Sequence, residues 1–110
     1  MYSRSKTGSE WGKELEEIQE NAFTGCKNLE GTLFLPDSLK CICRDAFSGC
    51  ASIDSLVLPD SVSELGTYAF ANCAGLKEIK IGKGLLKLSR GVFRFCSGIH
   101  EFVVPENILL

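Results

Sequence analysis

The hydrophobic positions of this chain recur with a period of 23 or 24 residues. The period is marked by a short phrase in which a phenylalanine precedes a cysteine by three residues. The phrase occupies 22–26, 46–50, 69–73 and 92–96. Self-similarity at a fixed period of roughly 20 to 50 residues is typical of proteins built from stacked repeats. The pattern therefore predicts a repeat solenoid of about four coils of 23 residues.

Each repeat carries the same order of short elements, as the second repeat shows. The alternation Leu-Val-Leu at 56–58 has a period of two residues and predicts a half-buried strand. Pro59 lacks a backbone donor and ends this strand, after which Val62 and Leu65 point back toward the core. The apolar residues of 68–73 have helical spacing, so we expect a single helical or 3-10 turn at this corner. The fold is therefore expected to be mainly β.

Stacking the coils places equivalent residues above one another, because a single coil cannot bury its own apolar side. The strand columns are Leu33 and Leu35, Leu56 and Leu58, Ile79 and Ile81, and Phe102 and Val104. A phenylalanine column and a cysteine column follow from the recurring phrase. The first repeat holds one extra residue between Leu29 and Leu33, which accounts for the one spacing of 24 residues.

We expect a single domain at 11–110 after a polar, flexible tail at 1–10. Its divisions are a half-repeat at 11–21, repeats at about 22–45, 46–68 and 69–91, and an incomplete repeat at 92–110. The first segment has a second interpretation, because Trp11, Leu15 and Ile18 also have the spacing of an amphipathic capping helix. The equivalence of Leu15 and Ile18 with Val62 and Leu65 favours half a repeat.

The chain stops within a repeat, at Ile108, Leu109 and Leu110, without a polar cap. A solenoid end of this kind would expose its apolar stack and a sheet edge, which is a template for association. We therefore expect either a homodimer that forms through this end or a fragment of a longer array.

The repeat columns resemble the BspA-like class of leucine-rich repeats. The second unit matches the pattern of that class nearly throughout, at Ile53, Leu56, Leu58, Pro59, Ser61, Val62, Leu65, Gly66, Ala69, Phe70 and Cys73. Departures are Gln19, Cys43 and Ser89 at a glycine position and Gly82 at a proline position. The resemblance implies a curved, right-handed solenoid whose strands line a concave face. It also implies a protein-interaction scaffold, often found on bacterial surfaces with adhesion roles, and it brings no catalytic residues.

Composition and charge exclude several other classes. The chain has 110 residues and a net charge of −2, so no strong attraction to nucleic acid or to an anionic membrane is expected. No apolar run approaches the 18 or so residues that a membrane span needs. Residues 1–10 lack the apolar region of a signal peptide. The protein is thus expected to be intracellular or, as the resemblance suggests, surface-exposed or secreted after loss of a leader.

Six cysteines would suit a disulfide framework, but four of them share the column of the recurring phrase. Their side chains point the same way inside a packed core, so we expect free thiols there. Cys41 and Cys43 lie outside that column. A lone C-x-C is a weak metal signal, since zinc takes four ligands and the only histidine, His100, is more than two repeats away. We expect no metal; Cys43 fills a glycine slot, and Cys41 is an exposed thiol available for an intermolecular disulfide.

The strand residues that face away from the core form a candidate binding surface. Between the core positions lie Phe34, Val57, Lys80 and Val103, and one step earlier lie Thr32, Ser55, Glu78 and Glu101. Contiguous exposed apolar side chains often mark an interaction site. The alternative is that β-propensity alone favours valine and phenylalanine at these positions. In the functional interpretation, the apolar side chains bind a partner while Lys80, Glu78 and Glu101 provide selectivity.

Candidates for catalysis are weak. His100 precedes Glu101, but no serine or cysteine stands in a strained nucleophile motif. The sequence Gly82-Lys83-Gly84 lacks the remainder of a phosphate-binding loop. We therefore expect neither an enzyme nor a cofactor. The sequence predicts a non-catalytic module that binds a protein, or alternatively a glycan, on its concave strands. The competing hypothesis is a structural repeat fragment that self-associates and has no separate ligand.

Overall fold

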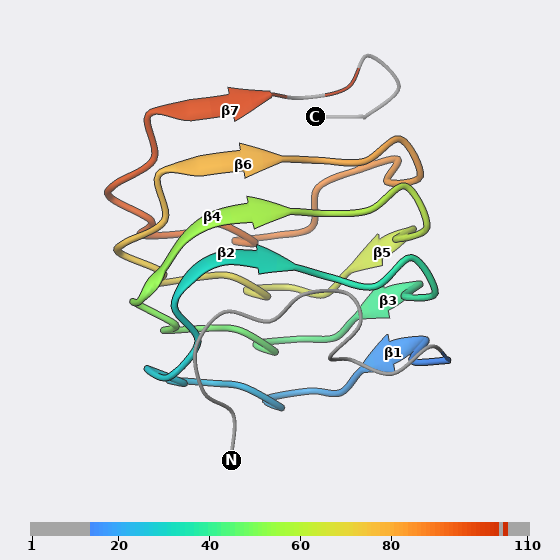
Figure 1. Cartoon of the computed structure of the whole chain (residues 1–110), viewed down its shortest axis with the longest axis horizontal. Coiled ribbons are helices and arrows are strands. Elements are labelled where there is room, and N and C mark those ends of the chain that lie inside the picture. The colour runs from blue at the N-terminus through green and yellow to red at the C-terminus, as the bar shows by residue number, and fades with distance from the viewer. Residues whose placement is uncertain (1–13, 104, 106–110) are drawn as a thin grey trace.

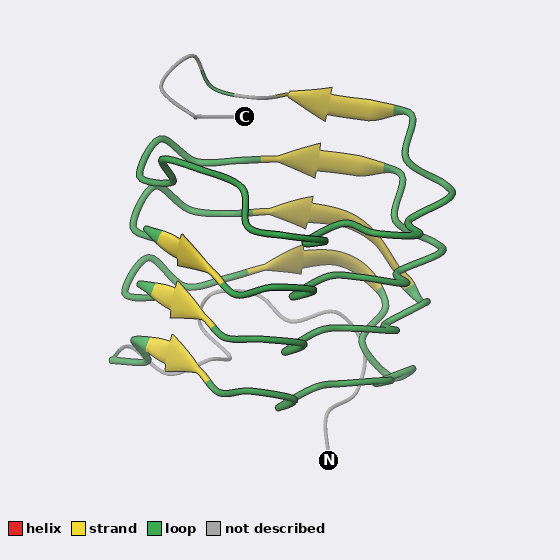
Figure 2. Cartoon of the chain, turned by 180° about the vertical axis from the view of Figure 1, so that it is seen from behind, coloured by secondary structure: helices red, strands yellow, loops and turns green. Residues whose placement is uncertain are grey.

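The computed structural model describes residues 14–103 and 105, which form a solenoid of parallel strands (Figure 1). One sheet contains β2 (Gly31–Phe34), β4 (Ile53–Val57), β6 (Glu78–Lys80) and β7 (Glu101–Val103). A smaller sheet contains β1 (Glu17–Ile18), β3 (Cys41–Ile42) and β5 (Glu64–Leu65). Figure 2 shows both sheets from behind. Neighbouring strands come from successive coils, so the predicted repeat solenoid is confirmed.

The register of the strands places equivalent residues side by side. Leu33 pairs with Leu56, Leu56 with Ile79, and Ile79 with Phe102. These columns are buried in the lower coils, while Phe102 in the last strand is half-buried. In the small sheet, Ile42 lies between Ile18 and Leu65. The core is thus the space between the two sheets, and each column fills it with side chains of similar size.

The phenylalanine column closes the third side of each coil. The rings of Phe23 and Phe47 are stacked with centroids 5.1 Å apart, and those of Phe47 and Phe70 are also 5.1 Å apart. Phe93 continues the stack with its centroid 5.9 Å from that of Phe70, and the rings of Phe93 and Phe102 are nearly perpendicular with centroids 5.3 Å apart. Ring spacings of this size match the distance between adjacent parallel strands, about 4.8 Å. The predicted stacking of like side chains is therefore confirmed.

The cysteine column consists of free thiols, and its three buried members do more than fill space. Each of them donates a hydrogen bond to the carbonyl of the phenylalanine one coil below. Cys50 donates to Phe23 at 3.1 Å, Cys73 to Phe47 at 3.2 Å, and Cys96 to Phe70 at 3.0 Å. The sequence led us to treat these residues only as small hydrophobes. In the structure they also add a side-chain hydrogen bond between successive coils.

The corners differ locally from the prediction. They keep i→i+3 hydrogen bonds, such as Ala46 N to Cys43 O and Cys50 N to Phe47 O. The described residues contain no helical or 3-10 turn at these corners, because two residues of each corner have positive φ. In the second corner these are Asp45 (56°) and Gly49 (75°), each at the third position of a turn, as in type II turns. The intervening N–H groups are then free to bond the next coil, as Phe47 N does with Ala69 O at 2.8 Å.

The first described coil begins with a strand. The segment 11–21 could be half a repeat or a capping helix by its sequence. Its residues 14–20 contain a strand and turns like those of the later coils, and Trp11 lies outside the described residues. The extra residue of the first repeat appears as a register irregularity between Gly31 and Thr32. Gly31 absorbs it with a φ of 73°. The tail at 1–10 and the predicted association residues Ile108, Leu109 and Leu110 also lie outside the described part.

Removing one ring from the phenylalanine column should be costly. We expect Phe47→Ala to lower the free energy of unfolding by about 3–5 kcal/mol, because the ring is fully buried and contacts two stacked neighbours. The matched control is Phe95→Ala, since Phe95 is 65% exposed and should lose under about 1 kcal/mol. Urea denaturation followed by circular dichroism measures both changes. Equal losses for the two variants would contradict the column as the core.

The buried thiols should also make the fold sensitive to alkali. Burial raises the pKa of Cys50 to about 11 from its ordinary value of 9.0. Below pH 9 both states keep the proton, whereas between about 9 and 11 only the unfolded chain loses it, so stability falls as pH rises through that window. In Cys50→Ala this contribution is absent, and the fall in urea midpoint across the same window should be smaller. An equal fall in both proteins would show that the Cys50 thiol does not contribute.

Candidate functional site

The outer face of the large sheet carries the predicted binding residues in one column. Phe34 is the Cα partner of Val57, Val57 of Lys80, and Lys80 of Val103. Phe34 is 46% exposed and Val103 is 57% exposed. The members of the column project outward because strand side chains alternate in direction: Leu33, beside Phe34, and Ile79, beside Lys80, are turned into the core. We call this column the apolar stripe; Lys80 is its one charged member.

A polar column runs beside the apolar stripe, and its members are Thr32, Ser55, Glu78 and Glu101. Ser55 Oγ donates a hydrogen bond to Glu78 Oε1 at 3.2 Å. Glu78 and Glu101 are direct cross-strand partners, and both are exposed. Like charges opposite one another destabilise a sheet modestly. This end of the polar column is therefore an acidic pair that a basic group would stabilise.

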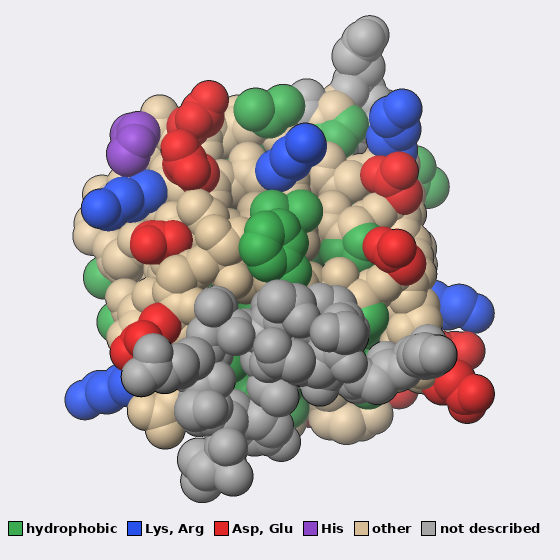
Figure 3. All heavy atoms as spheres, viewed as in Figure 1, with side chains coloured by type: hydrophobic (Ala, Val, Ile, Leu, Met, Phe, Trp, Pro, Cys, Tyr) green, Lys and Arg blue, Asp and Glu red, His purple; other side chains and the backbone are tan. Residues whose placement is uncertain are grey.

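The two columns line a shallow groove. Its volume is about 410 Å³, and its floor includes Leu56 and Ile79 between the outward side chains. Figure 3 shows hydrophobic side chains in the middle of this face, with a basic side chain among them and acidic side chains nearby. A second hollow of about 300 Å³ adjoins it and includes Asp54, Lys77 and His100. The structure thus brings all the residues predicted for this site onto one continuous surface.

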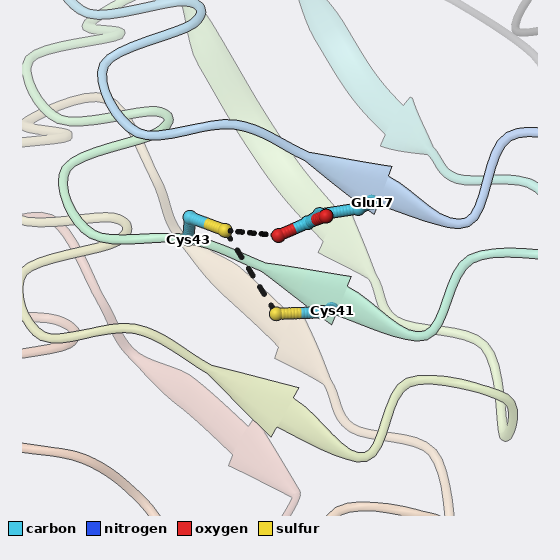
Figure 4. Close-up of side chains that lie close together, drawn as sticks. All are labelled: Glu17, Cys41 and Cys43. Carbon is cyan, nitrogen blue, oxygen red and sulfur yellow. Dashed lines mark hydrogen bonds between the residues drawn. The ribbon is translucent and has the colours of Figure 1, made fainter.

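A second group of side chains comes together on the outer face of the small sheet (Figure 4). Cys43 Sγ donates a hydrogen bond to Glu17 Oε2 at 3.1 Å and lies 3.9 Å from Cys41 Sγ. Among the described residues, these three form the group of ligand-type side chains close enough to share a metal ion, with ligand atoms all within 4.8 Å of one another. The sequence singled out both cysteines but missed Glu17. The signal was present in the repeat alignment, which places Glu17 one coil before Cys41.

The surroundings of Cys41 and Cys43 favour the protonated form of both thiols. Partial burial raises the pKa of Cys41 above its ordinary value of 9.0, and the nearby carboxylates of Glu64 and Glu17 add to that effect. Burial and the hydrogen bond to Glu17 raise the pKa of Cys43 to about 12. Since the thiolate is the reactive form, neither thiol is an activated nucleophile. This chemistry does not suit a catalytic cysteine.

Comparison with known proteins identifies the repeat. A sequence profile described as the BspA type leucine rich repeat region (6 copies) matches residues 2–109. The chain belongs to the BspA type leucine-rich repeat family. The resemblance inferred from the repeat columns is thereby confirmed. Repeat folds of this family have interaction or structural roles and are typically non-enzymatic.

Two solved structures resemble this BspA type repeat chain. A leucine-rich repeat protein of Treponema pallidum is 40% identical with a TM-score of 0.79, and the match covers 84% of this chain and 43% of that one. A leucine-rich repeat protein of Bacteroides ovatus is 23% identical with a TM-score of 0.53, covering 84% of this chain and 36% of that one, which shows the fold alone. The chain spans less than half the length of either protein. No curated protein sequence matches it.

The helix content bears on membrane association. Within the part of the chain that the structure describes, no helix is long and apolar enough to cross a membrane.

Thiol labelling should separate the two classes of cysteine. In the native protein we expect Cys41 and Cys43 to be alkylated slowly at pH 7 and faster as pH rises, because their raised pKa values leave little thiolate. The buried Cys50, Cys73 and Cys96 should react only after unfolding. Mass spectrometry of timed, quenched reactions measures each site. Rapid native labelling of the buried three, or a disulfide among them, would contradict the packed column.

Proposed function

We propose that this chain is a non-catalytic protein-interaction module and that its partner binds the groove over β2, β4, β6 and β7. The observation that carries the proposal is the apolar stripe, in which Phe34 and Val103 keep about half of their surface exposed in the lining of the groove. Exposed apolar side chains that gather on one face of a protein favour association. Exposed valines scattered singly over a surface are common and would not indicate a binding site.

The chemistry of the groove describes the partner. The polar column offers hydrogen-bonding groups to any partner, but the apolar stripe beside it offers none to sugar hydroxyls, which favours a protein over a glycan. The acidic pair Glu78 and Glu101 would bind a basic side chain of the partner beside the apolar contact. Lys80 would bind an acidic side chain of the partner. Complementary charges of this kind set specificity and association rate more than affinity. A protein segment with apolar side chains flanked by both charges therefore fits this face.

Catalysis is not part of the proposal. His100 is exposed at the margin of the second hollow, and its neighbours there are Asp54, Lys77 and Glu78. The thiols outside the core are protonated rather than activated. The described part of the groove thus offers contact surface and charge; its Ser55 hydroxyl is hydrogen-bonded to the exposed Glu78 carboxylate, and no histidine lies among the residues that line it.

A site-specific cross-linking experiment tests the binding face. A photoreactive amino acid placed at position 57 or 103 should capture the same partner in cells of the source organism, and one at position 86 should not. Leu86 is a matched position because it is 59% exposed and lies outside the groove. The captured protein is then purified and its affinity measured directly. Equal capture from all three positions would contradict the proposal.

Substitution sharpens the same test. We expect Val57→Glu or Val103→Glu to weaken binding of that purified partner by at least about tenfold, because each buries an unpaired charge in an apolar contact. Leu86→Glu, the same chemical change outside the groove, should leave the dissociation constant unchanged. Titration calorimetry measures all three. Unchanged affinity for both valine variants would show that the partner binds elsewhere.

Self-association is the second candidate, and one observation favours it. In the described residues β7 pairs with β6 on one side only, and an edge strand is a template for another chain. Light scattering across a range of concentrations decides between a monomer and an assembly. A monomer at every concentration removes this candidate, whereas an assembly that persists in Val57→Glu and Val103→Glu would place self-association away from the groove.

A further inference from the structure

We propose that Glu17, Cys41 and Cys43 form a binding site for a thiophilic divalent cation such as Zn²⁺ on the outer face of the small sheet. The inference does not depend on the binding groove, which lies on the other sheet. Two sulfur ligands and one carboxylate come from two coils that are remote in sequence and adjacent in space (Figure 4).

The spacing of the ligand atoms suits a tetrahedral ion. Two thiolates bound to zinc at about 2.3 Å in tetrahedral geometry lie about 3.8 Å apart. The Sγ atoms of Cys41 and Cys43 are 3.9 Å apart. Glu17 Oε2 lies 3.1 Å from Cys43 Sγ, and all three ligand atoms lie within 4.8 Å of one another. The three atoms therefore need only small movements to surround one ion.

The backbone brings the three ligand residues together before any ion arrives. Glu17 and Cys41 are Cα partners in adjacent parallel strands, so their side chains leave the sheet on the same face. Cys43 follows two residues after Cys41, and its N–H donates to the carbonyl of Ile18 at 2.9 Å. Ligands held on paired strands lose little freedom on binding, which favours affinity.

The charge around the cluster also favours a cation. Cys41 in β3 has Glu17 of β1 as its Cα partner on one side and Glu64 of β5 on the other. Carboxylates therefore flank the cysteines from both neighbouring strands. The basic side chains next to Cys41 and Cys43 in the chain are engaged elsewhere: Lys40 pairs with Glu16 at 3.9 Å and Arg44 with Asp45 at 3.6 Å. A divalent ion that displaces the two thiol protons to solvent leaves the net charge of the cluster unchanged, and the Glu17 carboxylate that accepted a hydrogen bond from Cys43 becomes a ligand.

The ligand types narrow the choice of ion. Thiolates select zinc, cadmium and copper(I) over calcium and magnesium, and a carboxylate ligand is common for zinc. Three protein ligands leave a fourth position for water, and the partial exposure of the cluster allows water to reach it. Because the two sulfurs are also close enough to oxidise to a disulfide after rotation, the test must be made under reducing conditions.

Cadmium is the probe, since its bonds to thiolate produce a charge-transfer absorption in the ultraviolet. Titration of the reduced, folded chain should give this absorption with one ion per chain, and a large excess of Zn²⁺ should compete for the site and weaken it, because thiolates bind the softer cadmium more tightly. We expect Cys41→Ser or Cys43→Ser to weaken binding by more than about a hundredfold and Glu17→Gln by about tenfold, since even indirect ligand partners change affinity by about 10- to 100-fold.

Two matched controls test the assignment. Glu16→Gln removes a carboxylate from the neighbouring residue, and Cys26→Ser removes the other thiol that is not fully buried. Both should bind cadmium as the unchanged chain does. Circular dichroism and urea midpoints confirm that each variant is folded, so that a loss of binding reports the ligand and not the fold.

Four results would overturn the proposal. They are an absorption that survives in the double variant Cys41→Ser/Cys43→Ser, its loss in Cys26→Ser, one ion for every two chains, and no binding by the reduced chain. The first two would place the ion on other thiols, and the third would assign it to a contact between copies. The last, together with a disulfide between these two residues found by peptide mapping after mild oxidation, would identify Cys41 and Cys43 as a disulfide pair.

Discussion

The vertical contact between successive coils is the interaction on which the rest of this protein depends. Each coil is too short to bury its own apolar side chains, so its stability comes from the coil above and the coil below. Stacked rings 5.1 Å apart, strand pairs in matching register and thiols that donate to the carbonyl one coil below all express that contact. A residue that breaks one column therefore affects two neighbours as well as its own coil.

The same stacking that builds the core also organises the surface. Because strand residues alternate in direction, a column of buried side chains implies a column of outward side chains beside it. On the large sheet this produces the apolar stripe and the acidic pair Glu78 and Glu101. On the small sheet it places Glu17, Cys41 and Glu64 in a row. Both candidate sites are thus consequences of the repeat, and they differ only in the residues that the repeat leaves variable.

The corners show how local conformation serves the stack. Positive φ at Asp45 and Gly49 turns alternate N–H groups toward the next coil, which a continuous helical turn would direct along its own axis. The corner thereby adds a further ladder of hydrogen bonds between coils. Apolar spacing in 68–73 suggested a helix because it reports which side chains point inward; it carries little information about where the backbone N–H groups point.

The amino-acid sequence by itself determined the number of coils, the core columns and the outward stripe. In a repeat that stacks on itself, each side chain lies beside its own equivalent in the adjacent coils. Phe34, Val57, Lys80 and Val103 could be placed together on that argument alone. Only the tertiary structure decided the turns at the corners and the meeting of Glu17 with Cys41 and Cys43. The turns depend on backbone φ values, which the apolar spacing does not specify. The meeting of the three side chains depends on side-chain directions at variable positions, where no apolar column fixes the conformation.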